Sequence, residues 1–191
     1  MKNNQSTLEI TNSIKVLEEG GLLLYPTDIG WCIGCDATNS NAVKKLFVLS
    51  ELSKKQSIFA MVQNDAMLER YIEKVPDLAY DILDIASKPT ILEYDQPKNL
   101  ATALISSTNT TRIYVATSKF CQYLIGRFKK PLAFTTANKF QHKVPKRFSE
   151  IAEPILSGVD YVVNLQEQEA HYTAPAIIAL SLSGKVKVIR E

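Results

Sequence analysis

The chain has few of the residues that mark secreted, membrane or metal-binding proteins. It has three cysteines and two histidines in 191 residues. A small, odd number of cysteines makes no disulfide framework and favours a reducing cytoplasm. His142 and His171 lie far apart, without the spacing of zinc ligands. No apolar run approaches the roughly 20 residues of a membrane helix, and we expect no signal peptide and no membrane partner.

A charge imbalance is also lacking. The chain has 22 Lys and Arg against 20 Asp and Glu, so net charge alone does not predict a nucleic-acid partner. Serine-histidine-acid and glycine-rich phosphate motifs are absent from the sequence. With 46% hydrophobic residues, this length favours one domain, expected over residues 1–191.

Helical and strand patterns alternate along the chain. Apolar residues at helical spacing, behind Ser, Asn or Pro, predict helices, and short apolar runs between turn residues predict strands. The expected helices are 7–19, 40–49, 76–86, 118–127 and 148–156. The expected strands are 22–25, 31–35, 57–62, 90–94, 112–115, 132–135, 161–165, 176–182 and 186–189. This order predicts an α/β fold with a twisted mixed sheet.

The segment from Leu22 to Asp36 is the most informative. Two apolar runs flank Pro26-Thr27-Asp28, a polar corner with no obvious packing role. Pro26 ends the strand ladder, which leaves Thr27 and Asp28 at a strand end, where open α/β sheets tend to bind ligands.

The same segment contains a Cys-x-x-Cys pair, Cys32 and Cys35. Redox pairs lie at helix amino ends, where the thiol pKa is lowered, whereas this pair lies in a predicted strand. Buried packing is therefore the favoured role, with redox or metal chemistry as the alternative.

Several segments, taken in order, resemble the YrdC-like family, whose best-known members are threonylcarbamoyl-AMP synthases. They are the Pro26-Thr27-Asp28 corner, Lys45-Leu46-Phe47, Lys88-Pro89-Thr90, the segment 131–138 and the segment 158–162. Within 131–138, Thr136 replaces the serine of a Ser-x-Asn signature that ends at Asn138. No single motif is specific, but their order and spacing from Gly20 to Arg190 are. The resemblance implies a YrdC-like α/β domain with a concave, locally basic site.

The family reaction joins threonine, bicarbonate and ATP into threonylcarbamoyl-adenylate and releases pyrophosphate. The resemblance thus implies ATP with Mg²⁺ as cofactor, threonine and bicarbonate as substrates if the chain is active, and a link to tRNA modification or translation. The residues expected to bind nucleotide or substrate are Thr27, Asp28, Arg112, Thr136, Asn138, Lys54 and Lys55. A hydrogen-bonded turn is the alternative role for Thr136 and Asn138.

The sequence departs from the family where the nucleotide should bind. The usual Lys-x-Arg falls on Ser50-Glu51-Leu52, which removes two cations and adds a carboxylate. An expected arginine falls on Tyr114, although Arg112 lies on the same strand face, and an expected Ser-Thr pair falls on Pro175-Ala176. These departures favour a diverged paralogue and leave its synthase activity an open question.

One segment is strongly basic. Between Arg127 and Arg147 there is no Asp or Glu. The cations are Arg127, Lys129, Lys130, Lys139, Lys143, Lys146 and Arg147. They predict a positive field that contacts nucleotide phosphates or RNA, and the resemblance implies double-stranded RNA binding; a solvated loop is the alternative. The sequence therefore favours a nucleotide- or RNA-binding relative of threonylcarbamoyl-AMP synthase. The alternative is a non-catalytic protein that binds a small ligand or regulates a partner.

Overall fold

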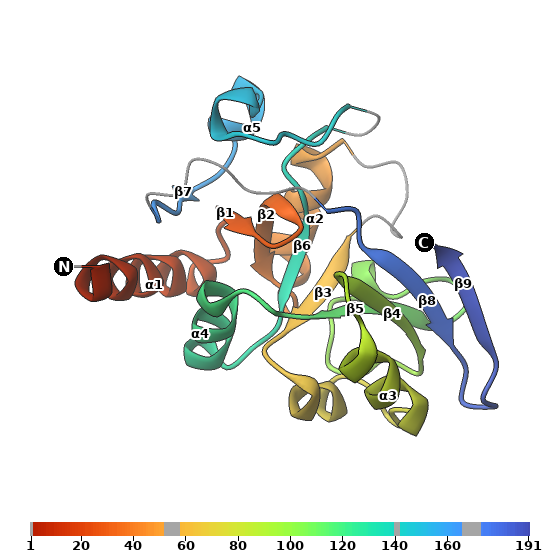
Figure 1. Ribbon diagram of the computed structural model, residues 1–191. Coiled ribbons are helices and arrows are strands. Elements are labelled where there is room, and N and C mark those ends of the chain that lie inside the picture. Colours follow the sequence, from red (N-terminus) through yellow and green to blue (C-terminus); the bar gives the residue numbers. More distant parts are fainter. Residues whose placement is uncertain (1, 52–57, 140–141, 166–172) are drawn as a thin grey trace.

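The computed structural model describes residues 2–51, 58–139, 142–165 and 173–191. Within these ranges the strands form one mixed sheet of nine strands, in the order β7-β1-β2-β6-β3-β5-β4-β8-β9 (Figure 1). The strands are β1 Leu23–Thr27, β2 Gly30–Asp36, β3 Phe59–Val62, β4 Thr90–Asp95, β5 Thr110–Val115, β6 Leu132–Thr136, β7 Tyr161–Val162, β8 Ala176–Leu180 and β9 Val186–Arg190. The prediction of an α/β fold with a mixed sheet is confirmed.

Five α-helices and three short 3₁₀ helices lie in the described ranges. They are α1 Lys2–Glu18, α2 Ser40–Leu49, α3 Asp77–Ile85, α4 Lys119–Phe128, α5 Glu153–Leu156, η2 Asp65–Arg70, η3 Thr102–Leu104 and η4 Phe148–Glu150. Asn39 caps α2 by accepting from the N–H groups of Asn41 and Ala42, and Ser118 caps α4 by accepting from that of Cys121. No described helix is long and apolar enough to cross a membrane.

The helix expected over 148–156 is wrong as one element. The structure has η4, an extended Ala152 (φ −65°, ψ 138°) and then α5. Pro154 explains the break, because it has no N–H to donate and its ring clashes with the carbonyl four residues earlier in a continuous helix. Proline is tolerated only in the first turn of a new helix, which is where α5 places it.

Cross-strand pairs define the face of the sheet that carries the candidate site, here called the site face. On it Cys32 lies opposite Thr136, and Phe134 lies opposite Phe59. Tyr114 of β5 is the partner of Met61, two residues after Phe59, so it shares this face. Arg112, two residues before Tyr114, does so too. The site face thus collects side chains from β1, β2, β6, β3 and β5.

Candidate functional site

Thr27 closes the turn between β1 and β2. Its hydroxyl donates to the carbonyl of Gly30 (2.8 Å) and accepts from the N–H of Ile29 (3.1 Å). Cys32 Sγ lies 3.5 Å from the same oxygen. Because Thr27 is buried and its hydroxyl already has partners in the turn, its visible role is to shape the corner.

Asp28 ties this turn to the end of β5. Its carboxylate accepts hydrogen bonds from the hydroxyls of Tyr114 and Thr117, although Tyr114 lies 86 positions away in the sequence. The Tyr114 ring lies 6.2 Å from that of Phe134, centroid to centroid. Burial, followed by the hydrogen bond to Asp28, raises the pKa of the Tyr114 phenol above its usual value. The tyrosine is thus a neutral donor to a half-buried carboxylate.

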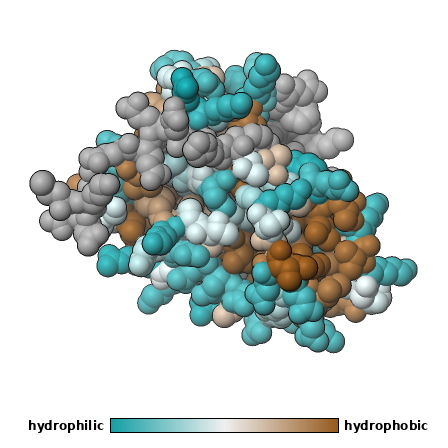
Figure 2. Space-filling model, in the orientation of Figure 1, coloured by the Kyte–Doolittle hydropathy of each residue, from teal (hydrophilic) through white to brown (hydrophobic). Residues whose placement is uncertain are grey.

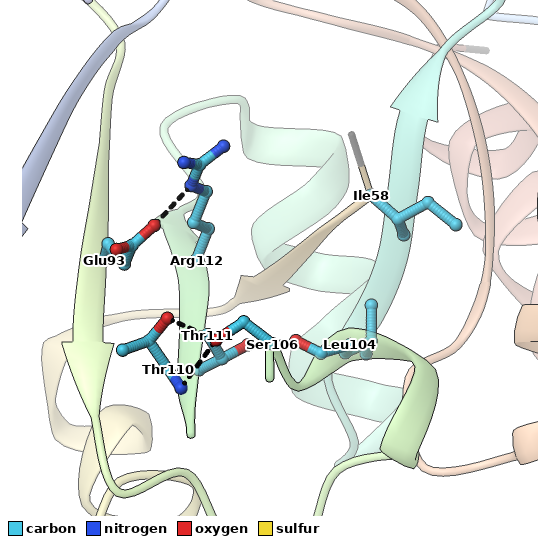
Figure 3. Close-up of a pocket in the computed structure, with 7 residues that line it drawn as sticks. All are labelled: Ile58, Glu93, Leu104, Ser106, Thr110, Thr111 and Arg112. Carbon is cyan, nitrogen blue, oxygen red and sulfur yellow. Dashed lines mark hydrogen bonds and ion pairs between the residues drawn. The ribbon is translucent and has the colours of Figure 1, made fainter. Parts of the chain in front are cut away.

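Arg112 lines a small pocket at the start of β5 (Figure 3). Its Nε donates to Glu93 Oε2 on the neighbouring β4 at 2.7 Å, and the two side chains are only 13% and 18% exposed. The other lining residues are Ile58, Leu104, Ser106, Thr110 and Thr111. The cavity measures about 20 Å³, room for about one water molecule. The Arg112 cation is therefore already neutralised where it meets the pocket.

The turns after α2 and after β6 meet through an ion pair between Glu51 and Lys139. Asn138 organises the second turn, because its Nδ2 donates to the carbonyls of Lys139 (3.1 Å) and His142 (2.9 Å). The position where the resemblance implies cations thus lies beside the Thr136–Asn138 turn, as the site hypothesis requires. At that position Glu51 contributes a carboxylate to the turn.

Three polar atoms near these turns are buried and have no hydrogen-bond partner among the residues that the structure describes. They are Ser50 Oγ, Trp31 Nε1 and Asn138 Oδ1, here called the polar trio. The carbonyl of Trp31 accepts from the N–H of Ala137, next to Asn138, and Ser50 precedes the Glu51 that pairs with Lys139. A buried polar group without a partner costs about 1–3 kcal/mol. A ligand that reaches the polar trio could satisfy these atoms. Trp31 alternates with Cys32, so its side chain lies on the sheet face opposite the site face.

The predicted site residues fall into separate groups. Thr27, Thr136 and Arg112 share the site face, and Thr136 is only half-buried. Asn138 lies in the turn just after β6. Lys54 and Lys55 lie outside the described residues. The binding roles of all of them stay predictions.

Strand β6 divides the basic segment in two. Arg127, Lys129 and Lys130 precede it, whereas Lys139, Lys143, Lys146 and Arg147 follow it. Five extended residues span about 17 Å, twice the screening length of about 8 Å at physiological salt. Lys130 is bound to Asp36 at 2.8 Å. Only the second group borders the Asn138 turn, so the segment makes two positive regions and not one field.

The cysteines have the packing role that the strand position favoured. Cys32, Cys35 and Cys121 are buried and free. Three residues apart in a strand, Cys32 and Cys35 point to opposite faces. Burial raises the pKa of all three thiols, that of Cys121 to about 12. Among the residues that the structure describes, no group of three His, Cys, Asp or Glu could hold a metal ion.

The sequence matches the model of the Sua5/YciO/YrdC family, described as "Telomere recombination", over residues 15–191. The chain belongs to this family. It is 28% identical to the threonylcarbamoyl-AMP synthase of Pseudoalteromonas translucida over 188 residues, 96% of this chain and 97% of that one. This confirms the YrdC-like resemblance drawn from the motifs.

Two solved structures of the Sua5/YciO/YrdC family share the fold. E. coli YciO superposes with a TM-score of 0.81 at 19% identity, over 97% of this chain and 89% of that one. P. abyssi Sua5 complexed with L-threonine gives 0.80 at 18% identity, over 90% of this chain and 50% of that one. The chain spans about half the length of Sua5.

The sequence reasoning missed the partners of the site residues. Glu93 was a detectable signal, since it is a lone charge within the buried run of β4 and lies opposite Arg112. Trp31 was another, as the one tryptophan of the chain at the start of a buried strand. The contact between Asp28 and Tyr114 had no signal, because it joins segments that only the tertiary fold brings together.

Proposed function

We propose that this protein is a ligand-binding relative of threonylcarbamoyl-AMP synthase, linked to tRNA modification, with little or no adenylate-forming activity. One observation carries the proposal: described cations at the site are paired with carboxylates. Lys139 is bound to Glu51, and Arg112 is bound to Glu93. Asp28 adds a further carboxylate, held by the neutral donors Tyr114 and Thr117.

A triphosphate needs cations that are available to its oxygens. Losing one preorganised donor to a developing charge costs about 3 kcal/mol, or about a hundredfold in rate. Paired cations and an added carboxylate therefore predict weak binding of the ATP phosphates and slow pyrophosphate departure. Mg²⁺ would be held chiefly through those phosphates, so it would be bound weakly as well.

The uncharged part of a nucleotide fits the site better. Ser50 Oγ and Asn138 Oδ1 can accept hydrogen bonds, and Trp31 Nε1 can donate one. Ribose hydroxyls and base edges present the complementary groups. We therefore propose nucleoside recognition at the polar trio, with the threonine of the family reaction as a second ligand.

Pyrophosphate release from ATP, with and without threonine and bicarbonate, tests the proposal. We expect no threonine-dependent release above that of a buffer control. Robust release that disappears in Lys54→Ala or Lys55→Ala, but not in the control Lys129→Ala, would show that other cations serve the triphosphate. In that case the chain is a working synthase and the proposal is wrong.

RNA binding is a second candidate function, favoured by the group that follows β6. Lys143 and Lys146 are exposed, and they border the Asn138 turn. If they contact a phosphate backbone, tRNA affinity should fall steeply with salt, and Lys143→Glu/Lys146→Glu should reduce that slope. Arg127→Glu/Lys129→Glu, at the other end of β6, is the matched control. If the salt dependence of tRNA affinity is the same in the wild type and in both variants, the segment is a solvated loop that does not contact RNA.

A further inference from the structure

Strand β9 is an open edge of the sheet. It is the last strand in the sheet order, and among the described residues no strand pairs with its outer side. All five of its residues are exposed. Figure 2 shows apolar surface on the right of the molecule, where Figure 1 places β8 and β9. The candidate nucleotide site uses none of the β9 residues.

The two faces of β9 differ in chemistry. Lys187 lies opposite Ala179, which in turn lies opposite Glu93, so the lysine is on the site face. Val186 and Val188 alternate with Lys187 and therefore lie on the other face of the sheet. They are 48% and 54% exposed. The strand thus has one basic face and one apolar face.

The basic face of β9 carries further cations. Lys185 alternates with Val186, and Arg190 is paired with Ile177 on the site face, so both lie with Lys187. Both lysines are exposed, and there is no Asp or Glu from 185 to 190. In the part of the chain that the structure describes, no carboxylate forms an ion pair with either lysine. The two charges are therefore available to a partner.

The hydrogen bonds of the β8–β9 hairpin determine which backbone groups of β9 face outward. The N–H of Ser181 donates to the carbonyl of Lys185 at 3.0 Å, so these two residues form a bonded pair. Bonded and non-bonded pairs alternate in an antiparallel ladder, which makes the next pair, Leu180 with Val186, a non-bonded one. The N–H and C=O of Val186 therefore point away from β8, toward the open edge.

An edge strand of this kind can accept a further strand from another protein. Side chains that lie directly opposite each other on one face then contact, and like charges there are destabilising. Lysines on an edge prevent unselective pairing for this reason. A strand with Asp or Glu opposite Lys185 and Lys187, and with apolar residues opposite Val186 and Val188, matches both faces of β9.

We propose that β9 binds an extended segment of a partner protein in which acidic and apolar residues alternate, added as a further strand at this edge. Charge complementarity selects the acidic residues, and the exposed valines select the apolar ones. The register shift that follows Val188 is a bulge that interrupts regular pairing, so the matching segment is short. This binding is separate from nucleoside recognition and does not require it.

Amide NMR spectra of the full chain, titrated with a short peptide of alternating Glu and Val, test the proposal. We expect a dissociation constant of about 1 mM or below, with the largest shifts in β9 and slowed hydrogen exchange at the Val186 amide. A peptide of the same length with alternating Lys and Val is the control, and it should bind at least about tenfold more weakly. If the glutamate peptide shifts no amide of β9, or if both peptides bind equally, the proposal is wrong.

Charge reversal on β9 tests the selectivity. Lys185→Glu/Lys187→Glu should reverse the preference, so that the lysine peptide binds at least about tenfold more tightly than the glutamate peptide. Lys143→Glu/Lys146→Glu, on another part of the molecule, should keep the wild-type preference. The same spectra confirm that each variant is folded. An unchanged preference in Lys185→Glu/Lys187→Glu contradicts the proposal.

RNA is the other polyanion that the basic face of β9 could contact. If Lys185→Glu/Lys187→Glu weakens tRNA binding while the wild type does not bind the glutamate peptide, the basic face contacts RNA and the proposal is overturned. If tRNA affinity is unchanged in this variant and the peptide preference reverses, the proposal is supported.

Discussion

Two polar corners of the site treat their hydrogen-bonding groups in opposite ways. In the turn between β1 and β2, the Thr27 hydroxyl and the Asp28 carboxylate are bonded to protein atoms. At the turns after α2 and β6, Ser50, Asn138 and the nearby Trp31 each keep a buried polar atom that has no partner in the described part of the chain. Both corners look alike in sequence, as polar residues at the ends of apolar runs. The number of hydrogen-bond partners distinguishes a corner that stabilises the fold from one that is suited to bind a ligand.

The β1–β2 turn owes its closed network to its local sequence. The expectation that Pro26 ends the strand is wrong, because β1 runs through Pro26, paired with Trp31, to Thr27, paired with Gly30. Gly30 takes a φ of 109°, which a residue with a side chain rarely adopts. The chain therefore reverses within three residues, and Thr27 Oγ1 is left facing the backbone groups that it bonds. In the turn after β6, Asn138 Nδ2 bonds the backbone but Oδ1 does not, and a salt bridge joins this turn to the one after α2.

Among the substitutions, the largest effect on stability should come from Asp28→Ala. The change leaves the buried Tyr114 hydroxyl and that of Thr117 without their acceptor, and hydrogen bonds to charged groups contribute about 1.5–3 kcal/mol each. We expect a loss of about 3 kcal/mol in the free energy of unfolding, measured in urea. Glu18→Ala on exposed α1 is the control and should stay within about 0.5 kcal/mol. If Asp28→Ala lowers the free energy of unfolding by less than about 1 kcal/mol, this turn contributes no more to stability than the turns after α2 and β6.

Alkaline pH should destabilise the protein, because three cysteine thiols are buried in its core. Burial raises the pKa of Cys121 from 9.0 to about 12, and also raises those of Cys32 and Cys35. The unfolded chain therefore loses these protons first, and stability is full below pH 9 and falls above it. Above pH 9, each thiol should lower the free energy of unfolding by about 1.4 kcal/mol per pH unit. Urea titrations between pH 8 and 10.5 measure the slope, and a flat profile would contradict the burial of the thiols.

Thr27→Val should have an intermediate effect. It keeps the shape of the side chain but removes the hydroxyl that bonds Gly30 and Ile29. We expect a loss of about 1–2 kcal/mol in the free energy of unfolding. Thr27→Ser keeps the hydroxyl and should recover most of it. If valine is tolerated while serine is not, the methyl group and not the hydroxyl holds the turn.

Ser50→Ala should have the smallest effect on stability. Its hydroxyl is buried and has no partner among the described residues, so removing it should change the free energy of unfolding by less than about 0.5 kcal/mol or raise it slightly. The same urea titration measures this. A loss above about 1 kcal/mol would mean that the hydroxyl is bonded in solution and that the two corners do not differ.

The sequence predicts the sheet well because its strands are short apolar runs with clear boundaries. It predicts the helix start at Ser40, and places the start of the next expected helix at Ser118, one residue before α4 begins at Lys119, because Asn39 and Ser118 are cap residues. It fails at Pro154, where a helical pattern of apolar residues hides a backbone break. It also fails to pair Asp28 with Tyr114 or Glu51 with Lys139, because those contacts depend on the packing of distant segments.

The family resemblance predicts where a site would lie but not which contacts its residues would make. The resemblance marked Ser50-Glu51 and Asn138 as parts of one site, and the structure places their turns together. It could not indicate that Glu51 would pair with Lys139, or that Arg112 would pair with Glu93. Those pairings change the charge that a ligand meets, and they depend on contacts between segments that are distant in the sequence.

The fluorescence of Trp31, the one tryptophan of the chain, gives the most direct test of this account. Its indole N–H belongs to the polar trio, so a ligand bound there should change its emission. Because the site cations described here are paired, ATP and adenosine should bind with dissociation constants within about tenfold of each other. Ser50→Ala should weaken both ligands about fivefold, the loss of about one hydrogen bond. Binding of ATP more than about a hundredfold tighter than adenosine would show that the phosphates are recognised, and would contradict the account.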